Sequence, residues 1–449
     1  MKYKVSNYNY IINNQDGDYL LYNTLNGRRS FLKVKKQDKA KIQALMDCNS
    51  EFDVGMVEKK LIDKGYVIPE NYDEESKIKE IFEQKLEERV LNLIIAPTGK
   101  CNLRCVYCCE DFEGYKMSID TQDSIINYVD KNIDSYSGVN VDWFGGEPLL
   151  AVDVIEHIAT RLIAICKEHR KPYTSFITTN GTLLDLQTFE KLCKLKIVMY
   201  QITIDGTKSV HDKQRVGQDG TPTFDTIMNN LRSIRDSKIG RHTIIMILTN
   251  YSKVLKDEVH EYKEYFAEVF GGDRRFCFNC NIIMNLGGGR IKEYISKVDD
   301  FEGINRFYES IIQDPIKLPF VYEEFLEPGS QLCYAAKKNS YLIAEDGRLY
   351  KCEHIYQTRK DEAIGYLDKY GEMILNGNEE KWLGKFDYCK DNKCRLKPLC
   401  LGEDCIKRRV DGIYKGTCSC EFHECHFVKQ SVEWILRLLD RERDIFELI

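Results

Sequence analysis

The stretch Ala96–Cys108 reads APTGKCNLRCVYC and places three thiols, those of Cys101, Cys105 and Cys108, at C-x3-C-x2-C spacing. Three thiolates on one short loop can hold three irons of a four-iron, four-sulfur cluster, which leaves the fourth iron open to another ligand. The alternative is a zinc site, but zinc favours paired Cys-x2-Cys units and a fourth protein ligand, and the sequence offers no obvious one near this loop. An open iron is a catalytic feature, so the loop predicts an enzyme.

An apolar segment, Leu91–Ala96, precedes this loop and is predicted to be a strand. The strand followed by C-x3-C-x-aromatic-C resembles the signature of the radical S-adenosylmethionine (SAM) enzymes. The resemblance implies that SAM binds the open iron through its amino and carboxylate groups. It further implies that an electron, supplied by a donor such as flavodoxin or ferredoxin, splits SAM into methionine and a 5′-deoxyadenosyl radical that abstracts hydrogen from the substrate.

Composition narrows the class of protein further. A chain of 449 residues with 43% hydrophobic content can form two or three domains, and its net charge of -6, with acidic and basic residues interspersed, argues against nucleic acid as a partner. We find neither the apolar core of a signal peptide nor an apolar run of membrane-spanning length, so a cytoplasmic protein without membrane contact is expected. In the cytoplasm, the 18 cysteines are predicted to bind metal or act in catalysis rather than to form disulfides.

Residues 1–87 are predicted to form a separate, winged-helix-like module. Strands are expected at Tyr8–Ile12, Asp18–Tyr22 and Arg28–Val34, and helices at 37–47, 53–64 and 73–88. A winged helix often binds DNA, but Val54–Lys64 has balanced charge and offers little grip on phosphate. The arrangement resembles the peptide-recognition element found in front of enzymes that modify ribosomally made peptides, where a leader peptide adds a strand to the sheet edge. A purely structural N-terminal cap is the alternative.

Residues 88–315 alternate predicted strands and helices, which is the pattern of parallel βα units in an α/β fold. Strands are predicted at 91–96, 139–144, 173–179, 199–204, 243–248 and 276–284, with helices near 119–135, 151–169, 185–195, 223–236, 257–270 and 297–313. Six units fall short of a closed eightfold barrel and match the partial (β/α)6 barrel of the radical SAM core. The cysteine loop is then expected at the carboxyl ends of the strands, where such barrels build active sites.

The loops after the other predicted strands supply candidate contacts to SAM. Gly145-Gly146-Glu147-Pro148 resembles the family's GGEP motif, whose glycines let the backbone approach a ligand and whose carboxylate can accept hydrogens from the SAM ammonium. By the same resemblance Arg215 is the partner of the SAM carboxylate. His211 is predicted to be a structural histidine in a turn. The predicted cofactor-binding residues are Tyr107, Gly145, Gly146, Glu147, Thr203 and Arg215.

Cysteines crowd the segment 316–425, where few helices and strands are predicted and metal clusters would supply folding energy. Cys333, Gly347 and Cys352 fit a C-x9-15-G-x4-C pattern, which resembles the SPASM domain with its two auxiliary iron–sulfur clusters. The middle run of that domain is usually C-x2-C-x5-C-x3-C, whereas two of the gaps here are longer. A zinc ribbon is the alternative, although its paired knuckles do not recur here.

The resemblance implies a ligand set for each auxiliary cluster. The first would use Cys333, Cys352 and Cys405, and the second Cys389, Cys394 and Cys400 with one of Cys418, Cys420 or Cys425. Together with the catalytic cluster, three [4Fe-4S] clusters are expected.

Residues 426–449 carry apolar residues at helical spacing and predict a closing helix.

These features predict a radical SAM oxidoreductase that modifies a ribosomally synthesised precursor peptide. The reaction we favour is a cysteine thioether cross-link, as in ranthipeptide and sactipeptide synthases. Residues 281–332 contain no cysteine, whereas sulfatase-maturing relatives place an extra cluster ligand shortly before the counterpart of Cys333. Unless Cys280 or Cys418 closes the first auxiliary cluster, one of its irons would be open to substrate sulfur.

Two alternatives to thioether formation are kept. One is an anaerobic sulfatase-maturing enzyme, which oxidises Cys or Ser to formylglycine. The other is a non-catalytic iron–sulfur or DNA-binding regulator, which the SAM-side motifs argue against. Glu353 directly follows Cys352, where the sulfatase-maturing relatives place a catalytic Asp, and could act as a general base. A merely solvated Glu353 is the alternative for that position.

Overall fold

The computed structural model describes residues 2–47, 55–252, 255, 258–283, 290, 324–386, 394–403, 405–412, 424–442 and 445–448. The chain forms two compact units. The first unit comprises 1–87, 320–337 and 384–449, and the barrel unit comprises 88–319 and 338–383. The expected boundary after residue 87 coincides with a unit boundary. The segment expected as one domain, 316–425, is instead shared between the two units.

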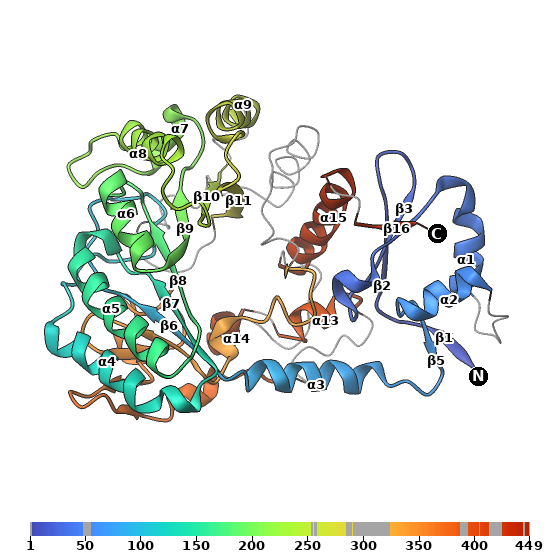
Figure 1. The fold of residues 1–449 in the computed structure, drawn as a ribbon, viewed down its shortest axis with the longest axis horizontal. Coiled ribbons are helices and arrows are strands. Elements are labelled where there is room, and N and C mark those ends of the chain that lie inside the picture. The colour runs from blue at the N-terminus through green and yellow to red at the C-terminus, as the bar shows by residue number, and fades with distance from the viewer. Residues whose placement is uncertain are drawn as a thin grey trace. The chain divides into compact units, whose positions relative to one another are not determined.

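Six parallel strands form the centre of the barrel unit (Figure 1). They are β6 (Val90–Ile95), β7 (Gly138–Trp143), β8 (Tyr173–Thr179), β9 (Ile197–Thr203), β10 (Ile244–Tyr251) and β11 (Phe276–Ile282). Each strand pairs with its neighbour in chain order, from Val90 opposite Gly138 to Tyr251 opposite Ile282. All six predicted strands are confirmed, with boundaries that differ by a few residues at most.

Helices connect these strands, as parallel pairing requires. They are α4 (Ile119–Asn132), α5 (Val152–Glu168), α6 (Leu186–Lys194), the short α7 (Lys208–Gln214), α8 (Phe224–Asp236) and α9 (Val259–Phe270). Ser118 and Asp185 cap α4 and α6 by accepting hydrogen bonds from backbone N–H groups of the first turn. Helix α5 buries Ile155, Ile158 and Leu162 at spacings of three and four residues. The predicted helix at 297–313 lies outside the described residues.

Four more strands extend the same sheet beyond β6. Strand β12 (Ser340–Ile343) pairs parallel with β6, and β13 (Arg348–Tyr350), β14 (Gly365–Leu367) and β15 (Met373–Leu375) follow in antiparallel order. Gly347 has a φ of +82° in the turn between β12 and β13, which explains a glycine at this position of the cysteine pattern. The prediction of little regular structure after residue 315 is therefore wrong for 340–375.

The first unit contains two small sheets. Strands β1 (Tyr3–Val5) and β5 (Val67–Pro69) form one, and the other has the order β16 (Glu447–Leu448), β4 (Leu32–Val34), β3 (Tyr19–Asn23), β2 (Asn9–Asn13). The described helices of the first unit are α1 (Lys39–Asp47), α2 (Met56–Asp63), α3 (Glu74–Leu86), α13 (Lys397–Cys400), α14 (Ile406–Val410) and α15 (Glu424–Glu442). The three strands and three helices predicted near the start of the chain are present. The winged-helix interpretation of them stays a prediction.

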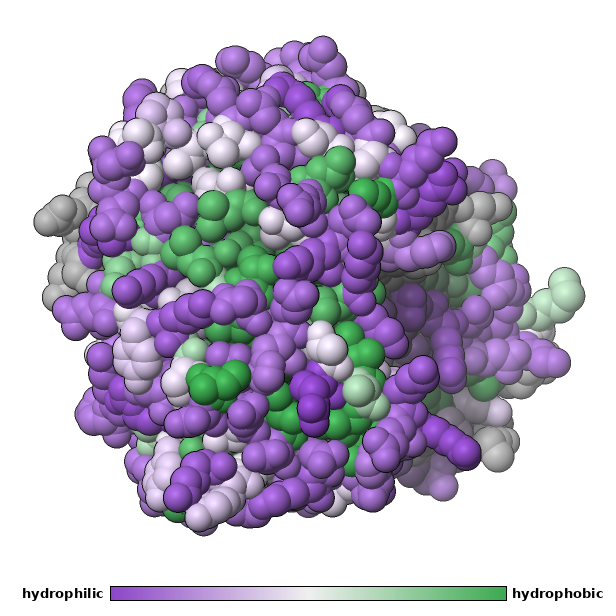
Figure 2. All heavy atoms as spheres, turned by 60° about the vertical axis from the view of Figure 1, so that its left-hand side comes forward, coloured by the Kyte–Doolittle hydropathy of each residue, from purple (hydrophilic) through white to green (hydrophobic). Residues whose placement is uncertain are grey.

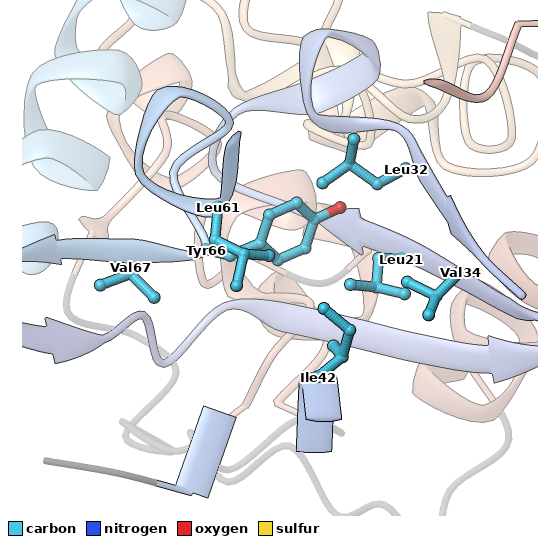
Figure 3. Packing of buried hydrophobic residues seen from close by; sticks show 7 residues of the cluster. All are labelled: Leu21, Leu32, Val34, Ile42, Leu61, Tyr66 and Val67. Atoms are coloured by element: carbon cyan, nitrogen blue, oxygen red, sulfur yellow. The ribbon is translucent and has the colours of Figure 1, made fainter. Parts of the chain in front are cut away.

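A hydrophobic core joins β3, β4 and β5 to α1 and α2 (Figure 3). It consists of Leu21, Leu32, Val34, Ile42, Leu61, Tyr66 and Val67. The predicted strand Arg28–Val34 is shorter than expected, because Gly27–Ser30 forms a 3-10 turn. Ser30 Oγ accepts from the Asn23 backbone N–H at 2.9 Å and donates to the Gly27 carbonyl at 2.6 Å, so its side chain stabilises the turn.

The predicted closing helix is confirmed as α15, which buries Trp434, Ile435, Leu438 and Leu439. It ends at Glu442, and the chain then forms β16 instead of continuing as helix. Hydrophilic side chains cover most of the face shown in Figure 2, with hydrophobic ones in separate patches between them. No helix in the described parts of the chain has the length and apolar character needed to span a membrane.

Candidate active site

A cavity of about 250 Å³ lies at the carboxyl ends of β6 to β11 in the barrel unit. The thiols of the predicted cluster loop, Cys101, Cys105 and Cys108, all line it. So do five of the six predicted SAM-binding residues: Tyr107, Gly145, Gly146, Thr203 and Arg215. Residues from the connections after β6, β7 and β9 thus meet at one place, as expected at the common carboxyl edge of parallel strands.

Backbone hydrogen bonds fix the cysteine loop from both sides. On one side, the N–H groups of Gly146 and Glu147 donate to the carbonyls of Thr98 at 3.1 Å and Lys100 at 2.8 Å. On the other side, the Arg104 N–H donates to the Val216 carbonyl at 2.8 Å. The GGEP loop therefore holds the cysteine loop directly, in addition to lining the cavity.

Gly146 makes the closest approach between these two loops. A Cβ atom on Gly146 would lie 2.3 Å from the Lys100 carbonyl oxygen, which is backbone and cannot turn aside. We expect Gly146→Ala to force the loops apart at a cost of about 1–3 kcal/mol and to weaken SAM binding by about tenfold or more. Equilibrium dialysis with labelled SAM measures this. Gly272→Ala is the matched control, because a Cβ there meets no atom within 4 Å. Equal SAM affinity of the two variants would contradict a role of the Gly146–Lys100 approach in SAM binding.

Glu147 is the one predicted SAM-binding residue that does not line the cavity. It is 0% exposed. Its carboxylate accepts hydrogen bonds from the Thr179 hydroxyl at 2.6 Å, the Asn180 N–H at 2.7 Å and the Leu149 N–H at 3.0 Å. The oxygens of this side chain thus join the β7 loop to the β8 loop, and its contact with the SAM ammonium stays a prediction.

Arg215 brings a positive charge into the cavity wall. Its guanidinium is buried, with 7% of the residue exposed, and Nη1 donates to the Tyr107 hydroxyl at 2.9 Å. Its Nε is buried and has no hydrogen-bond partner among the described residues. A buried donor without an acceptor is costly, and a carboxylate in the cavity would satisfy it. This arrangement fits the predicted pairing of Arg215 with the SAM carboxylate.

A hydrogen-bonded network holds Arg215 and Tyr107 in place. The Tyr107 hydroxyl donates to the Asp205 carboxylate and accepts from Asn250 Nδ2 at 3.0 Å. His211 Nδ1 accepts from the Asp205 N–H at 3.2 Å, and burial lowers the pKa of His211 well below its usual value, so the ring stays neutral. The structural role predicted for His211 is consistent with these contacts.

Asp205 and Asn250 were not predicted from the sequence. Asp205 follows the end of β9, and Asn250 is the next-to-last residue of β10. A polar residue at the carboxyl end of a parallel strand is the signal that could have found both.

The three thiols fit a four-iron cluster better than a single metal ion. Among the described residues, no group of three His, Cys, Asp or Glu side chains converges closely enough to hold one ion. A four-iron cluster needs a wider spacing, because each thiolate binds a different iron. Burial raises the pKa of Cys101 to about 12 and also raises the pKa values of Cys105 and Cys108. Cluster assembly must therefore displace protons from these thiols.

Carboxylates gather beside the cavity near Glu353. Burial raises the pKa of Glu110, which lines the cavity, to about 8, and raises that of Asp142 on β7 to about 7. The Glu353 side chain is 24% exposed and lies 3.7 Å from His354 Nε2. His354 lines the cavity and Glu353 does not. Glu110 and His354 were not predicted, and the role of Glu353 as general base stays a prediction.

The predicted auxiliary-cluster cysteines fall in different parts of the chain. Cys352 belongs to the barrel unit, two residues after β13, whereas Cys333, Cys394, Cys400 and Cys405 belong to the first unit. Cys389, Cys418 and Cys420 lie outside the described residues, and for Cys425 only its backbone position in α15 is described. The ligand sets therefore stay predictions.

Comparison with known families matches residues 95–264 to the Radical SAM superfamily. The chain thus contains a radical SAM domain, which implies SAM and a [4Fe-4S] cluster, and the resemblance drawn from the cysteine loop is confirmed. The matched range covers the cysteine loop, the GGEP loop and Arg215.

Two curated relatives and one solved structure extend the likeness over most of the chain. The cysteine-type anaerobic sulfatase-maturating enzyme of Clostridium novyi is 23% identical over 353 residues, which cover 73% of this chain and 91% of that enzyme. The serine-type enzyme of Klebsiella pneumoniae is 22% identical over 336 residues, covering 69% and 80%. The structure of anSMEcpe with bound AdoMet and Cp18Cys peptide superposes with a TM-score of 0.57 at 19% identity, covering 78% and 98%. At this identity the structural match shows a common fold.

Proposed function

We propose that this protein is a radical SAM enzyme that modifies a ribosomally made precursor peptide. The observation that carries the proposal is the single cavity shared by Cys101, Cys105 and Cys108 with the buried cation of Arg215. A four-iron cluster needs the three thiolates, and the carboxylate of SAM needs the cation. Few other cofactors require both kinds of group in one cavity.

Each group in the cavity then has a role. The three thiolates hold three irons, and Arg215 pairs with the SAM carboxylate while Tyr107 and Asp205 orient its guanidinium. The backbone of Gly145 and Gly146 and the end of β9 at Thr203 border the same space. SAM and the cluster, when bound, supply one-electron chemistry that removes hydrogen from a substrate. An external flavodoxin or ferredoxin is the proposed electron donor.

Relatives support a peptide as the substrate. The two curated relatives are sulfatase-maturating enzymes, and the anSMEcpe structure contains a bound Cp18Cys peptide. For this chain we propose that the first unit, which contains the predicted module 1–87, binds the leader part of a precursor. Its strand-rich start and balanced charge suit an extended peptide better than a nucleic acid.

Two reactions are candidates for that peptide. Thioether formation at cysteine is favoured by the absence of cysteine from residues 281–332, which removes one expected auxiliary-cluster ligand and would leave an iron for substrate sulfur. Formylglycine formation is favoured by the two sulfatase-maturating relatives. The auxiliary clusters, with ligands proposed among Cys333 to Cys425, would serve either reaction as electron acceptors.

Mass spectrometry separates the two reactions. The anaerobic enzyme is incubated with SAM, dithionite and a short cysteine-containing peptide encoded beside its gene. We expect a product that has lost hydrogen and kept its sulfur, as a thioether does. A product that reacts with hydrazide would establish formylglycine instead, with loss of sulfur if a Cys was oxidised and without it if a Ser was. If 5′-deoxyadenosine is released but no peptide tested is altered, the peptide assignment is contradicted and the radical SAM assignment is not.

A further inference from the structure

Three residues that line the active-site cavity each have a buried polar atom with no hydrogen-bond partner among the described residues. The atoms are Arg215 Nε, Glu110 Oε2 and His354 Nδ1. A buried donor or acceptor is costly to leave unpaired, so such atoms in a cavity wall indicate groups that a ligand satisfies. The carboxylate of SAM is the proposed partner of Arg215. Glu110 and His354 have no partner in that assignment.

Glu110 lies on a different side of the cavity from Arg215. The Tyr356 hydroxyl hydrogen-bonds to the Glu110 carboxyl, and a Cβ atom on Gly145, just after β7, would be 3.4 Å from the same hydroxyl. The network that holds Arg215 lies at the ends of β9 and β10. Strand β8 separates β7 from β9 in the sheet (Figure 1). The cavity therefore has a second polar side, next to the loop that carries His354 and Tyr356.

The backbone is strained in the turn that follows Glu110. Phe112, which also lines the cavity, has a φ of +63°, in the left-handed region that bulky residues rarely adopt. Gln357 Oε1 accepts hydrogen bonds from the N–H groups of Asp111 and Phe112, each at 3.1 Å. The Arg104 guanidinium lies 4.4 Å from the centroid of the Phe112 ring. These contacts hold a conformation that the turn alone would not keep, and such strain is found mostly at functional sites.

Gln357 also fixes the groups around Glu110. It is 6% exposed, and its Nε2 donates to the Tyr356 hydroxyl at 2.7 Å and to the Gly99 carbonyl at 3.2 Å. One side chain thus joins the cysteine loop, the strained turn and the hydroxyl that binds the Glu110 carboxyl. The acceptor on Glu110 is therefore held in place before a ligand binds, which lowers the entropic cost of binding.

We propose that Glu110 and His354 bind a backbone amide group of the peptide substrate, beside the residue that loses hydrogen. A peptide group offers one N–H donor and one carbonyl acceptor. Glu110 Oε2 accepts from the N–H, and an imidazole nitrogen can donate to the carbonyl. Gln357 acts through Glu110 as a positioning residue. This inference rests on the proposed peptide substrate and adds the residues that hold it in the cavity.

The amount of modified peptide formed per 5′-deoxyadenosine released tests this binding. The probe is the cysteine-containing peptide encoded beside the gene, incubated with the full-length enzyme, SAM and dithionite. Glu110→Met keeps the length of the side chain and removes both acceptors. It is expected to lower the ratio about tenfold or more, because a displaced substrate reacts poorly. A purely structural defect would lower both quantities together and leave the ratio unchanged.

Glu113→Met is the matched control for this variant. Glu113 belongs to the same loop, is exposed and does not line the cavity, so its replacement should leave the ratio unchanged. His354→Phe keeps a ring and removes the nitrogen atoms. It is expected to lower the ratio about threefold to tenfold, in line with the loss of one hydrogen bond.

Glu110→Gln separates a backbone amide from a cationic partner. The carboxamide oxygen still accepts from a neutral N–H, so the ratio should stay within about threefold of that of the unaltered enzyme. A loss as large as that of Glu110→Met would show that the negative charge is required. That result would overturn the assignment of a backbone amide in favour of a cationic side chain.

Gln357→Met tests the positioning role. It removes the acceptor for two backbone N–H groups and is expected to lower the ratio about as much as Glu110→Met does. Combining the two substitutions should cause no further fall, because both act on the same contact. Losses that multiply in the double variant would contradict a role of Gln357 through Glu110.

The outcomes separate this site from the proposed function. Equal ratios for Glu110→Met and Glu113→Met would overturn the inference and leave the proposed function in place. Weaker binding of labelled SAM to Glu110→Met in equilibrium dialysis would assign Oε2 to SAM and would also overturn it. If the unaltered enzyme releases 5′-deoxyadenosine and modifies no peptide, the peptide substrate is contradicted together with this inference, and the radical SAM assignment stands.

Discussion

A chain in which Cys101, Cys105 and Cys108 are all alanine is expected to release no 5′-deoxyadenosine from SAM in the presence of dithionite. The three thiols line one cavity, and among the described residues Cys109 is the one further cysteine that lines it. Loss of the thiolates removes the cluster that reduces SAM, so the effect is complete loss and not a change in affinity. Chromatography of the reaction mixture measures the product.

Single variants and a matched control sharpen this test. Each of Cys101→Ala, Cys105→Ala and Cys108→Ala is expected to give the same loss, since a cluster with two protein ligands is not held. Cys193→Ala is the control, because this thiol lies on α6 at 3.5 Å from the Tyr200 hydroxyl and does not line the cavity. SAM cleavage by the triple variant would show that the catalytic cluster is bound elsewhere.

Anaerobically purified protein is expected to contain about twelve irons per chain, the content of three four-iron clusters. Replacing Cys400 and Cys405 together should remove the iron of the auxiliary clusters and leave about four irons, because the radical SAM loop lies in the other compact unit. SAM cleavage by that variant tests whether the catalytic cluster is intact. Iron and zinc are measured by elemental analysis of the same sample. Stoichiometric zinc with about four irons in the unaltered protein would establish a zinc ribbon in the cysteine-rich segment.

The strands of the barrel unit could be predicted because each is a local apolar run with a turn signal behind it. Leu93, Ile95, Val139 and Val141 are buried, and the loops that follow carry the cysteine and GGEP motifs. The short strands after residue 338 could not be predicted in the same way. Strand β12 is four residues long, and its partner β6 lies about 250 residues earlier, so no local periodicity marks the pairing.

The residue types of the site were more predictable than the directions of the side chains. Arg215 and the three thiols meet as the motifs indicated, whereas Glu147 turns its carboxylate toward Thr179 and Asn180. A sequence motif records that a carboxylate is required at a position. It does not record whether that carboxylate binds the ligand or the neighbouring loop, because this depends on the path of β8 next to it.

Pairing of β12 with β6 has a consequence for where the barrel sheet can tolerate insertions. The Asn92 N–H donates to the Asn339 carbonyl at 2.8 Å and the Ala96 N–H to the Ile343 carbonyl at 3.0 Å, so the strand that leads into Cys101 and the hairpin that leads into Cys352 share one hydrogen-bond register. A slip of one residue in that register would turn every side chain of β12 to the opposite face. Insertions within β12, which would shift this register, should therefore be poorly tolerated. The position of Cys352 relative to Cys101 is therefore set by the pairing of β12 with β6 and not by a linker.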